Sequence, residues 1–393
     1  MATKKNKARR KVYKKTQRAG KFIFAGSSGC TFRPALKCVK EDIRRPGKIS
    51  KLMDKELAKE EFEVRELLKD IDPTFEYLIY PEDMCVPDIT NAPATASATA
   101  PATASAPATA TAAAEDNYEA CKLIDLTNKY IIPTVLILPD GGTNLEIINV
   151  EKEDFLAFFE AFLNIFKGIE LLHRNGIAHL DTKPANMVGL RLVTGEYKVR
   201  LIDFGLTRKA EEASKQIHIE NYLYWPFDIK LTTNLYTYNP KDVADYYRIQ
   251  KIRGSYYPDW LWYDKHGDAM IDKQLIAAIR TVITSGAATS ISLIYGVDIF
   301  ALGRSLAEIY GRLLRHRYIG YNNVKVETAT GSVAIQENIK QFVSLPIYKL
   351  VEKMVNVNLF ERPSITEAIR MYEEILPAMR EHFSKLVPAA ASP

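Results

Sequence analysis

The sequence from residue 154 to residue 176 is apolar on nearly every face that a helix would present: DFLAFFEAFLNIFKGIELLHRNG. A helix of this kind has to be buried on all sides, so it predicts a large core around it. Gly176 is placed to end the helix. The chain has 393 residues, which is enough for such a core and for more than one lobe.

The parts of the chain before and after this helix differ in character. Before it, strand-like segments at FIFAG (22–26) and KISKLM (48–53) precede a helix expected over about residues 54–71. After it, further helices are expected at residues 297–311 and at the capping-box pattern that begins with Ser364. A small strand-rich part is therefore followed by a larger helical part.

Residues 91–114 consist almost entirely of Ala, Pro, Thr and Ser. Such a stretch cannot bury enough surface to offset the entropy that is lost on ordering. Strand-like segments lie on both sides of it, FEYLIY (75–80) and YIIPTVLIL (130–138). We therefore expect a flexible insertion that interrupts one domain.

The N-terminal residues 1–21 are strongly basic, with ten Lys or Arg and no acid. The net charge of the whole chain is +5, so the remaining residues carry a net charge of −5. The tail has three interpretations: a disordered solubilising arm, a nuclear-import signal, or a contact with nucleic acid or an anionic surface. The sequence does not choose among them.

The four cysteines, Cys30, Cys38, Cys85 and Cys121, show no paired metal-ligand spacing, and we expect free thiols in a reducing compartment. The N-terminus lacks the apolar core of a secretory signal. No apolar run reaches the roughly eighteen residues that a membrane span requires. These features predict an intracellular protein with no membrane span.

A charged cluster, HLDTKPANM (179–187), follows the apolar helix. Asp181 is a carboxylate that can orient a hydroxyl group and accept its proton. Lys183 is a cation that can balance charge on a transferring group. Asn186 offers a neutral oxygen that suits a hard metal ion such as Mg²⁺.

A second cluster, LIDFG (201–205), follows an apolar strand. Asp203 adds a charged metal ligand, and Gly205 permits a backbone turn that other residues resist. Asp and Asn oxygens around a metal, with a further Asp nearby, describe a phosphoryl-transfer site.

These two motifs, in this order, resemble those of the eukaryotic-type protein kinases. HLDTKPANM is similar to their H-R-D-x-K-x-x-N catalytic loop, and DFG to their metal-binding motif. The resemblance implies an α+β, two-lobed fold, with a small antiparallel β-sheet N-lobe that has one main helix and a larger, mostly α-helical C-lobe. The expected parts are a basic disordered tail at 1–21, an N-lobe at 22–138 with the 91–114 insertion, a C-lobe at 139–383 with an insertion at 229–296, and a disordered C-terminus at 384–393.

The resemblance implies a phosphate-covering loop near the front of the chain. AGSSGCTF (25–32) has Gly26 and Gly29 at the G-x-x-G spacing. Phe24 stands where the family has its first glycine, and Thr31 where a Val usually contacts adenine. We expect a less supple loop that still functions.

A lysine on the following strand should contact the phosphates. In KISKLM, Ile49 and Lys51 point to one face because side chains alternate along a strand. The resemblance assigns Ile49 to adenine and Lys51 to the phosphates, with Lys48 as a competing candidate.

The family pairs that lysine with a glutamate on the next helix. Glu61 lies on a helical stripe with four apolar residues, Leu57, Val64, Leu68 and Ile71. A carboxylate on an apolar face is unfavourable unless it is paired, so we expect Glu61 to pair with Lys51. The alternative places Glu61 at the edge of the stripe, in water.

TVLILPDGGTNL (134–145) resembles the kinase hinge, whose backbone groups near Leu138 would hydrogen-bond adenine. A strand followed by a turn explains the same residues. Later segments also resemble the family, with Asp298 and Gly303 in a D-x-W-S-x-G-like helix. The resemblance further implies a buried ion pair between Asp228, in a degraded A-P-E motif, and Arg362.

The sequence departs from the family in further places. Leu180 replaces the Arg that often binds a phosphate on the activation segment, so we expect activation not to need that phosphorylation. The aromatic-rich insertion at 229–296 predicts a packed subdomain. The front loop, the helix that ends at an Asp-Pro and WPFD (225–228) resemble kinases of nucleocytoplasmic large DNA viruses more than cellular ones.

The resemblance implies a protein kinase that uses ATP and Mg²⁺ and acts on protein substrates. The family associates a lysine at position 183 with Ser/Thr acceptors. The expected location is the cytoplasm or nucleus of a host cell, or a virion. Two alternatives stay open: a pseudokinase that acts as a binding or scaffold protein, and a kinase-like phosphotransferase that acts on a small molecule.

Overall fold

The structure is a computed structural model that describes residues 20–26, 29–39, 47–88, 121, 131–216, 222, 224–226, 277, 290–318, 346–356 and 359–384. The chain divides into two compact units: the first unit comprises residues 1–62 and 81–140, and the second unit comprises residues 63–80 and 141–393. The predictions for nearly all of the basic tail, the 91–114 insertion, most of the 229–296 insertion, Asp228 and most of the C-terminal tail lie outside the described residues.

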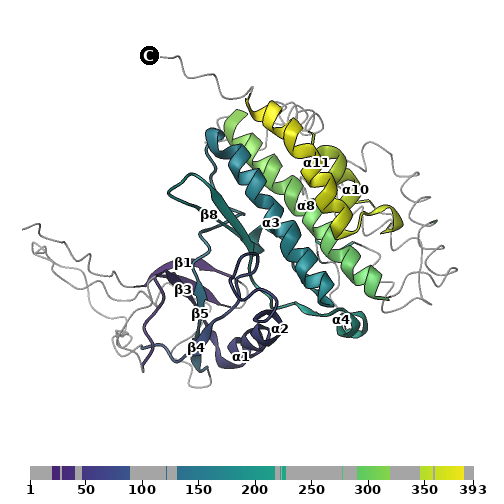
Figure 1. Cartoon of the computed structure of the whole chain (residues 1–393). Helices are drawn as coiled ribbons and strands as arrows, with labels where there is room; N and C mark the ends of the chain where they lie inside the picture. The colour runs from purple at the N-terminus through teal and green to yellow at the C-terminus, as the bar shows by residue number, and fades with distance from the viewer. Residues whose placement is uncertain are drawn as a thin grey trace, which may run out of the picture. The chain divides into compact units, whose positions relative to one another are not determined.

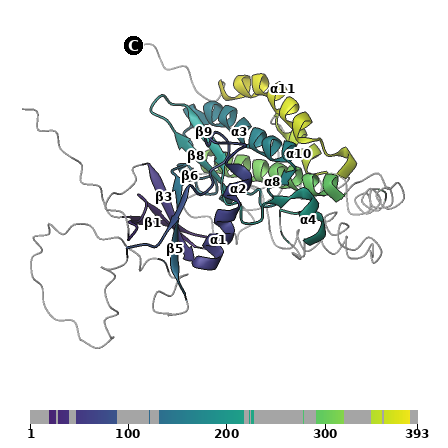
Figure 2. The same ribbon diagram turned by 60° about the horizontal axis from the view of Figure 1, so that its bottom comes forward.

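The first unit contains a five-stranded antiparallel sheet (Figure 2). The strands lie in the order β1 (Lys21–Ala25), β2 (Cys30–Arg33), β3 (Lys48–Asp54), β5 (Pro133–Pro139) and β4 (Asp83–Cys85). In β3, Ser50 and Leu52 are fully buried on one face, whereas Lys51 lies on the other face and is partly exposed. The register pairs Ile49 with Leu138 across β3 and β5.

The helix expected over residues 54–71 is interrupted. It forms α1 (Lys55–Glu63) and α2 (Arg65–Leu68), with a turn at Val64. The predicted stripe is wrong at Leu57, which is 45% exposed. The buried face of α1 runs instead through Ala58 and Glu61, three residues apart.

All four cysteines form disulfides, so the prediction of free thiols is wrong. Cys30 bonds to Cys121 and Cys38 bonds to Cys85, with Cα atoms 5.8 and 5.9 Å apart. Their partners are 91 and 47 residues away in the sequence. The sheet brings these positions together, and local spacing therefore gives no sign of the pairing.

In the second unit, the apolar stretch forms α3 (Phe155–Arg174), which is followed by Gly176 at φ +72°. The helices α8 (Ser290–Tyr318) and α11 (Ile365–Ser384) run beside α3, and the shorter α10 (Tyr348–Met354) packs on α8 (Figure 1). The core contains several fully buried aromatic rings of α3, those of Phe158, Phe159, Phe162 and Phe166. In the part of the chain that the structure describes, no helix is both long and apolar enough to cross a membrane.

Short strands next to α3 carry the loops of interest. A three-stranded sheet has the order β6 (Thr143–Asn144), β8 (Met187–Arg191) and β9 (Tyr197–Leu201). Separately, β7 (Ile177–Ala178) pairs with β10 (Arg208–Lys209), which leads into α4 (Ala210–Gln216). The elements of both units agree with an α+β fold that combines an antiparallel sheet with a helical part.

The segment FEYLIY, expected as a strand, forms only an isolated parallel β-bridge, between Leu78 and Leu201 of β9. The carboxylate of Asp72 accepts hydrogen bonds from the backbone N–H groups of residues 76–78 at 2.8–2.9 Å. Phe75 takes a left-handed conformation with φ +54°. The side chain of Asp72 therefore gives the backbone donors of residues 76–78 a local acceptor, whereas the N–H of Ile79 donates to the carbonyl oxygen of Leu201 at 2.8 Å.

Candidate functional site

The loop that carries Asp181 is fixed by a buried carboxylate on α8. Asp298 is fully buried, and its two oxygens accept hydrogen bonds from the backbone N–H groups of His179 (2.8 Å) and Leu180 (2.7 Å). The ring Nε2 of His173 lies 3.0 Å from the same carboxylate. Leu180 has φ +65°, a conformation that non-glycine residues rarely adopt. The bonds to Asp298 hold this strained backbone in place.

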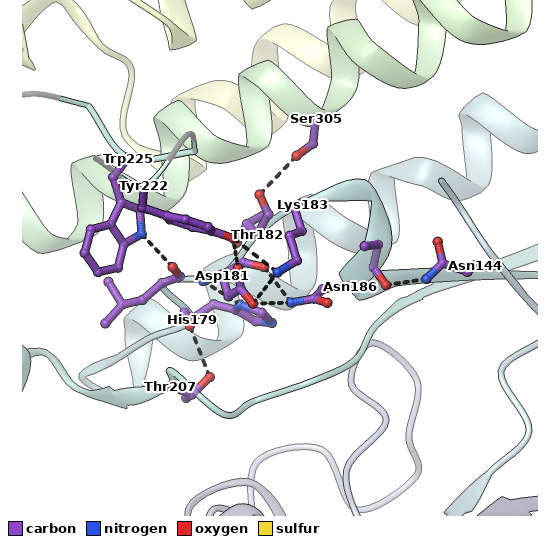
Figure 3. A network of polar contacts seen from close by, with 12 residues as sticks. Asn144, His179, Asp181, Thr182, Lys183, Asn186, Thr207, Tyr222, Trp225 and Ser305 are labelled. Carbon is purple, nitrogen blue, oxygen red and sulfur yellow. Dashed lines mark hydrogen bonds and ion pairs between the residues drawn. The ribbon is translucent and has the colours of Figure 1, made fainter. Parts of the chain in front are cut away.

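The carboxylate of Asp181 is the centre of a polar network (Figure 3). Its Oδ2 accepts hydrogen bonds from Lys183 Nζ at 2.9 Å and from Asn186 Nδ2 at 2.6 Å. Its Oδ1 accepts the hydroxyl of Tyr222, and Lys183 Nζ also donates to that hydroxyl at 3.2 Å. The structure therefore brings two other predicted site residues, Lys183 and Asn186, to the carboxylate of Asp181, which also binds a hydroxyl group.

Asn186 is oriented by its amide nitrogen. Nδ2 donates to both the backbone carbonyl and the side chain of Asp181, at 3.0 and 2.6 Å. Among the described residues, no group donates a hydrogen bond to its Oδ1. Asn186 Oδ1 is the oxygen that the sequence assigns to a metal ion, and it accepts no hydrogen bond from the described residues.

Asp203 follows β9 and lies next to a residue that contacts Asn186. The backbone N–H of Ile202 donates to the carbonyl oxygen of Asn186 at 2.9 Å, which ties the two loops together. Asp203 adopts a left-handed backbone conformation, with φ +60°. We expected an unusual backbone turn at Gly205, but Gly205 is not one of the described residues with a positive φ angle. A Cβ at Gly205 would lie 3.4 Å from Asp203 Oδ1, which is an ordinary contact, so the described geometry does not require glycine there.

The donor set fits the group that the sequence predicts. One carboxylate and one amide oxygen from adjacent loops are the hard oxygen ligands that Mg²⁺ prefers, and waters or phosphate oxygens usually complete its shell. Asn186 Oδ1 and the carboxylate of Asp203 are the two groups that would hold such an ion.

His179 is fully buried next to Asp181. Burial lowers the pKa of its ring, although three nearby carboxylates act in the opposite direction. Its Nδ1 accepts a hydrogen bond from the backbone N–H of Asp181 at 3.2 Å, and its ring packs on Phe204. His179 therefore supports the loop through these two contacts.

In the first unit, Lys51 and Glu61 form an ion pair. Their Nζ and Oε2 atoms are 2.6 Å apart, and their side chains are 13% and 8% exposed. The competing candidate, Lys48, bonds instead to Glu82 at 2.6 Å, and both of these side chains are 27% exposed. Glu61 is thus paired and not at the edge of a stripe in water.

The other predicted nucleotide residues lie on the same sheet. Ile49 and Leu138 are opposite each other across β3 and β5, and side chains in such a pair share one face. A Cβ at Gly29 would lie 2.5 Å from the carbonyl oxygen of Leu52, so only glycine permits this close approach. A Cβ at Gly26 would meet nothing closer than 3.7 Å.

Several residues that contact the site were not predicted to do so. The hydroxyls of Ser305 and Thr207 bond to the backbone carbonyls of Thr182 and His179 at 3.0 and 3.3 Å. Tyr222 lies 41 residues after Asp181, and no local sequence signal marks it. Arg362 donates to the carbonyl oxygen of Asn356 at 2.7 Å, while its predicted partner Asp228 lies outside the described residues.

Comparison with known proteins finds similarity to protein kinases. Residues 146–233 match the model of the protein kinase domain, and this part contains Asp181, Lys183, Asn186 and Asp203. The chain is also similar to three curated proteins, and each similarity covers about a quarter of this chain or less. They are mitogen-activated protein kinase sma-5 of Caenorhabditis elegans (34% identity over 97 residues), mitosis inhibitor protein kinase SWE1 of Candida albicans (30% over 105) and smooth muscle myosin light chain kinase of Gallus gallus (47% over 86).

These matches support the eukaryotic-type protein kinase superfamily. The aligned parts cover 24, 25 and 21% of this chain, and only 18, 8 and 4% of the three relatives. The match to the family model, over residues 146–233, contains the residues of the polar network around Asp181. The similarity and the geometry thus concern the same loops.

Proposed function

We propose that the chain is an ATP- and Mg²⁺-dependent protein kinase that transfers the γ-phosphoryl group of ATP to Ser/Thr hydroxyls of proteins. The observation that carries this proposal is the environment of Asp181. One of its oxygens accepts hydrogen bonds from Lys183 and Asn186, and the other accepts a hydroxyl group. A carboxylate that orients a hydroxyl beside a fixed cation is the arrangement that acceptor activation requires.

The side chains of the second unit have distinct roles in this proposal. Asp181 orients the acceptor hydroxyl and takes its proton, and Lys183 stabilises charge on the γ-phosphoryl group. Asn186 and Asp203 hold Mg²⁺, which neutralises phosphate charge when it is bound. Catalysis comes chiefly from positioning and from electrostatic stabilisation by these fixed groups.

The side chains of the first unit serve the nucleotide. Lys51, held by Glu61, contacts the inner phosphates of ATP, and the loop with Gly26 and Gly29 covers them. Ile49 and the backbone at Leu138 contact adenine. The choice of Ser/Thr over Tyr in protein substrates rests on the resemblance at Lys183.

The test is a transfer assay with labelled ATP, Mg²⁺ and generic protein substrates, with Asp203→Ala as the matched control. Labelled Ser or Thr in the substrates, lost in Asp203→Ala, supports the proposal. Consumption of ATP only with a small-molecule acceptor would replace the proposal with a small-molecule phosphotransferase.

A pseudokinase that acts as a scaffold is the second candidate. Phe24 in place of the first glycine and Leu180 in place of the family's Arg favour it. The paired Lys51 and Glu61 and the network around Asp181 weigh against it. Nucleotide binding without transfer to any acceptor, in the same assay, would establish this second function.

An intracellular location, in a host cell or a virion, remains a proposal, as does the similarity to viral kinases. The disulfides remove the free-thiol argument for a reducing compartment. Contact of residues 1–21 with nucleic acid or an anionic surface is also a proposal, supported by its ten basic residues.

A further inference from the structure

Phe24 stands in place of the family's first glycine, and its side chain is 39% exposed. It lies near the end of β1, two residues before Gly26 and the loop assigned to the phosphates. Single exposed apolar side chains are common on proteins, so the face of the sheet that carries this ring decides what the ring can do. A ring that faces a ligand site can bind through its flat apolar surface.

A β-bulge sets the direction of Phe24. In a regular strand Phe22 and Phe24 would lie on the same face, because side chains alternate. The register shifts between them, so that Phe22 pairs with Phe32 and Phe24 pairs with Thr31. The rings of Phe22 and Phe32 pack edge to face, with centroids 6.0 Å apart. Since Thr31 and Phe32 are neighbours on β2, the bulge turns Phe24 to the face opposite that of Phe22.

This face carries the other side chains of the sheet that are assigned to the nucleotide. Thr31 is paired with Phe24 on β1 and with Lys51 on β3, and directly paired side chains share a face. Ile49 lies two residues from Lys51, and its partner on β5 is Leu138. We call the face with these five side chains the nucleotide face. It presents an exposed aromatic ring, apolar side chains and a cation together.

The opposite face of the same sheet is covered by the chain itself. Phe32, Ser50 and Leu52 are fully buried there. The backbone N–H of Leu36 donates to Ser50 Oγ at 2.9 Å, so residues that follow β2 lie against this face. On the nucleotide face, Phe24 is the most exposed of the five side chains. Its ring is therefore the surface that a ligand would cover.

The Phe24 ring also lies next to the loop assigned to the phosphates. A Cβ at Gly26 would be 3.7 Å from Phe24 Cε1. The backbone N–H of Gly26 donates to the carbonyl oxygen of Gly29 at 2.9 Å, which closes the loop. The ring therefore stands where the part of the sheet assigned to adenine meets the loop assigned to the phosphates.

The end of β5 limits which other groups can recognise a base. Pro139 has no backbone N–H and cannot donate a hydrogen bond. The backbone N–H of Asp140 is already bonded to the carbonyl oxygen of Gly47 at 3.0 Å. These two positions leave no backbone donor for a base, so contact with the flat faces of the base gains importance.

We propose that Phe24 is a nucleotide-binding residue whose ring stacks on the adenine base of ATP, beside Thr31. The proposal rests on the nucleotide role proposed above for this face. Stacking between an aromatic side chain and a base is favourable because every base has a π-face. The residue that separates this chain from the family's glycine pattern thus strengthens nucleotide binding.

The experiment measures two dissociation constants by calorimetry on the full chain, those of ATP and of inorganic tripolyphosphate, each with Mg²⁺. Tripolyphosphate has the phosphates but no base. Phe24→Ala should weaken ATP binding about 5- to 100-fold and leave tripolyphosphate binding unchanged. Phe24→Trp should keep the ATP affinity, whereas Phe24→Leu, which is apolar but has no ring, should weaken ATP binding as Phe24→Ala does. Val39→Ala, which shortens another exposed side chain of the first unit, is the matched control and should leave both constants unchanged.

Three results would overturn the stacking. Phe24→Ala could weaken the binding of ATP and tripolyphosphate by the same factor, which would show that the ring only supports the loop. The ATP affinity could be the same in Phe24→Trp and Phe24→Leu. Phe24→Ala could keep the wild-type ATP affinity, and if the wild type also transfers phosphate to protein, the proposed kinase activity stands and only this inference fails. A wild type that binds no ATP would overturn both.

Discussion

In the second unit, the carboxylate of Asp298 on α8 holds the Asp181 loop through hydrogen bonds. The core of this unit is built from aromatic rings around α3. In the first unit, the side chains assigned to the nucleotide stand on a small sheet that is tied by two disulfides and one largely buried ion pair. A large core can hold a strained loop through packing and hydrogen bonds. A small one has less apolar area to bury and gains more from covalent links.

The largest expected effect is in the second unit, at Asp298. Asp298→Ala leaves the buried N–H groups of His179 and Leu180 without their acceptor, and it removes the partner of His173. We expect the free energy of unfolding to fall by about 4 kcal/mol in urea denaturation. Glu374→Ala, which removes an exposed partner of Arg370, is the control and should leave stability unchanged. Equal effects of the two variants would mean that Asp298 does not organise the loop.

The next effect concerns the disulfides and should be confined to the first unit. Replacing Cys30 and Cys121 by alanine should lower its free energy of unfolding by about 3 kcal/mol, and so should the same change at Cys38 and Cys85. Faster hydrogen exchange in β3 and β5 would report this loss. Tryptophan fluorescence is the control, because all three tryptophans belong to the second unit. Four thiols that react with a thiol reagent in the unreduced, unfolded protein would contradict the disulfides.

Within the first unit, the two lysines of β3 provide a matched pair. Lys51→Met leaves Glu61 largely buried without its partner, which should lower stability by about 2 kcal/mol. Lys48→Met breaks a more exposed pair with Glu82 and should lower stability by less than about 1 kcal/mol. Only Lys51→Met should also weaken nucleotide binding, measured by calorimetry. The reverse order of effects would assign the phosphate-binding role to Lys48.

The smallest expected effect is a change of the free energy of unfolding with pH that is caused by His179. Burial lowers its folded pKa below the ordinary value of 6.5, so the unfolded chain takes up the proton more readily. The stability from the neutral ring is complete above pH 6.5 and falls as the pH drops from there toward the folded pKa. This loss should be absent in His179→Phe, measured by urea denaturation at several pH values. Identical pH profiles for the two proteins would show that His179 is not the titrating group.

Local patterns predicted the features that depend on local physics. The helix from residue 154 was predicted because its apolar residues cover every face, and it forms α3. Ser364 was predicted to begin a helix, and its Oγ accepts the backbone N–H of Glu367 at 3.2 Å at the start of α11. The cluster of Asp181, Lys183 and Asn186 was visible because these residues lie within six positions of one another.

The failures come from contacts that span the chain or compete with a local pattern. Cys30 and Cys121 meet through the fold, across 91 residues. FEYLIY has the composition of a strand, but the carboxylate of Asp72 accepts the backbone N–H groups of residues 76–78 and leaves only a single bridge to β9. Tyr222 reaches Asp181 through a segment whose attachment depends on Trp225 and a distributed apolar cluster.

The central claim is that Asp181 activates an acceptor hydroxyl. The most direct measurement is the single-turnover rate of phosphoryl transfer to a protein substrate in Asp181→Asn, with nucleotide affinity measured on the same sample. Asp70→Asn, an exposed change of the same chemistry in the second unit, is the control and should keep the wild-type rate. We predict a loss of about 10²- to 10⁴-fold in rate for Asp181→Asn with nucleotide affinity retained. Transfer by Asp181→Asn at the wild-type rate would contradict the account.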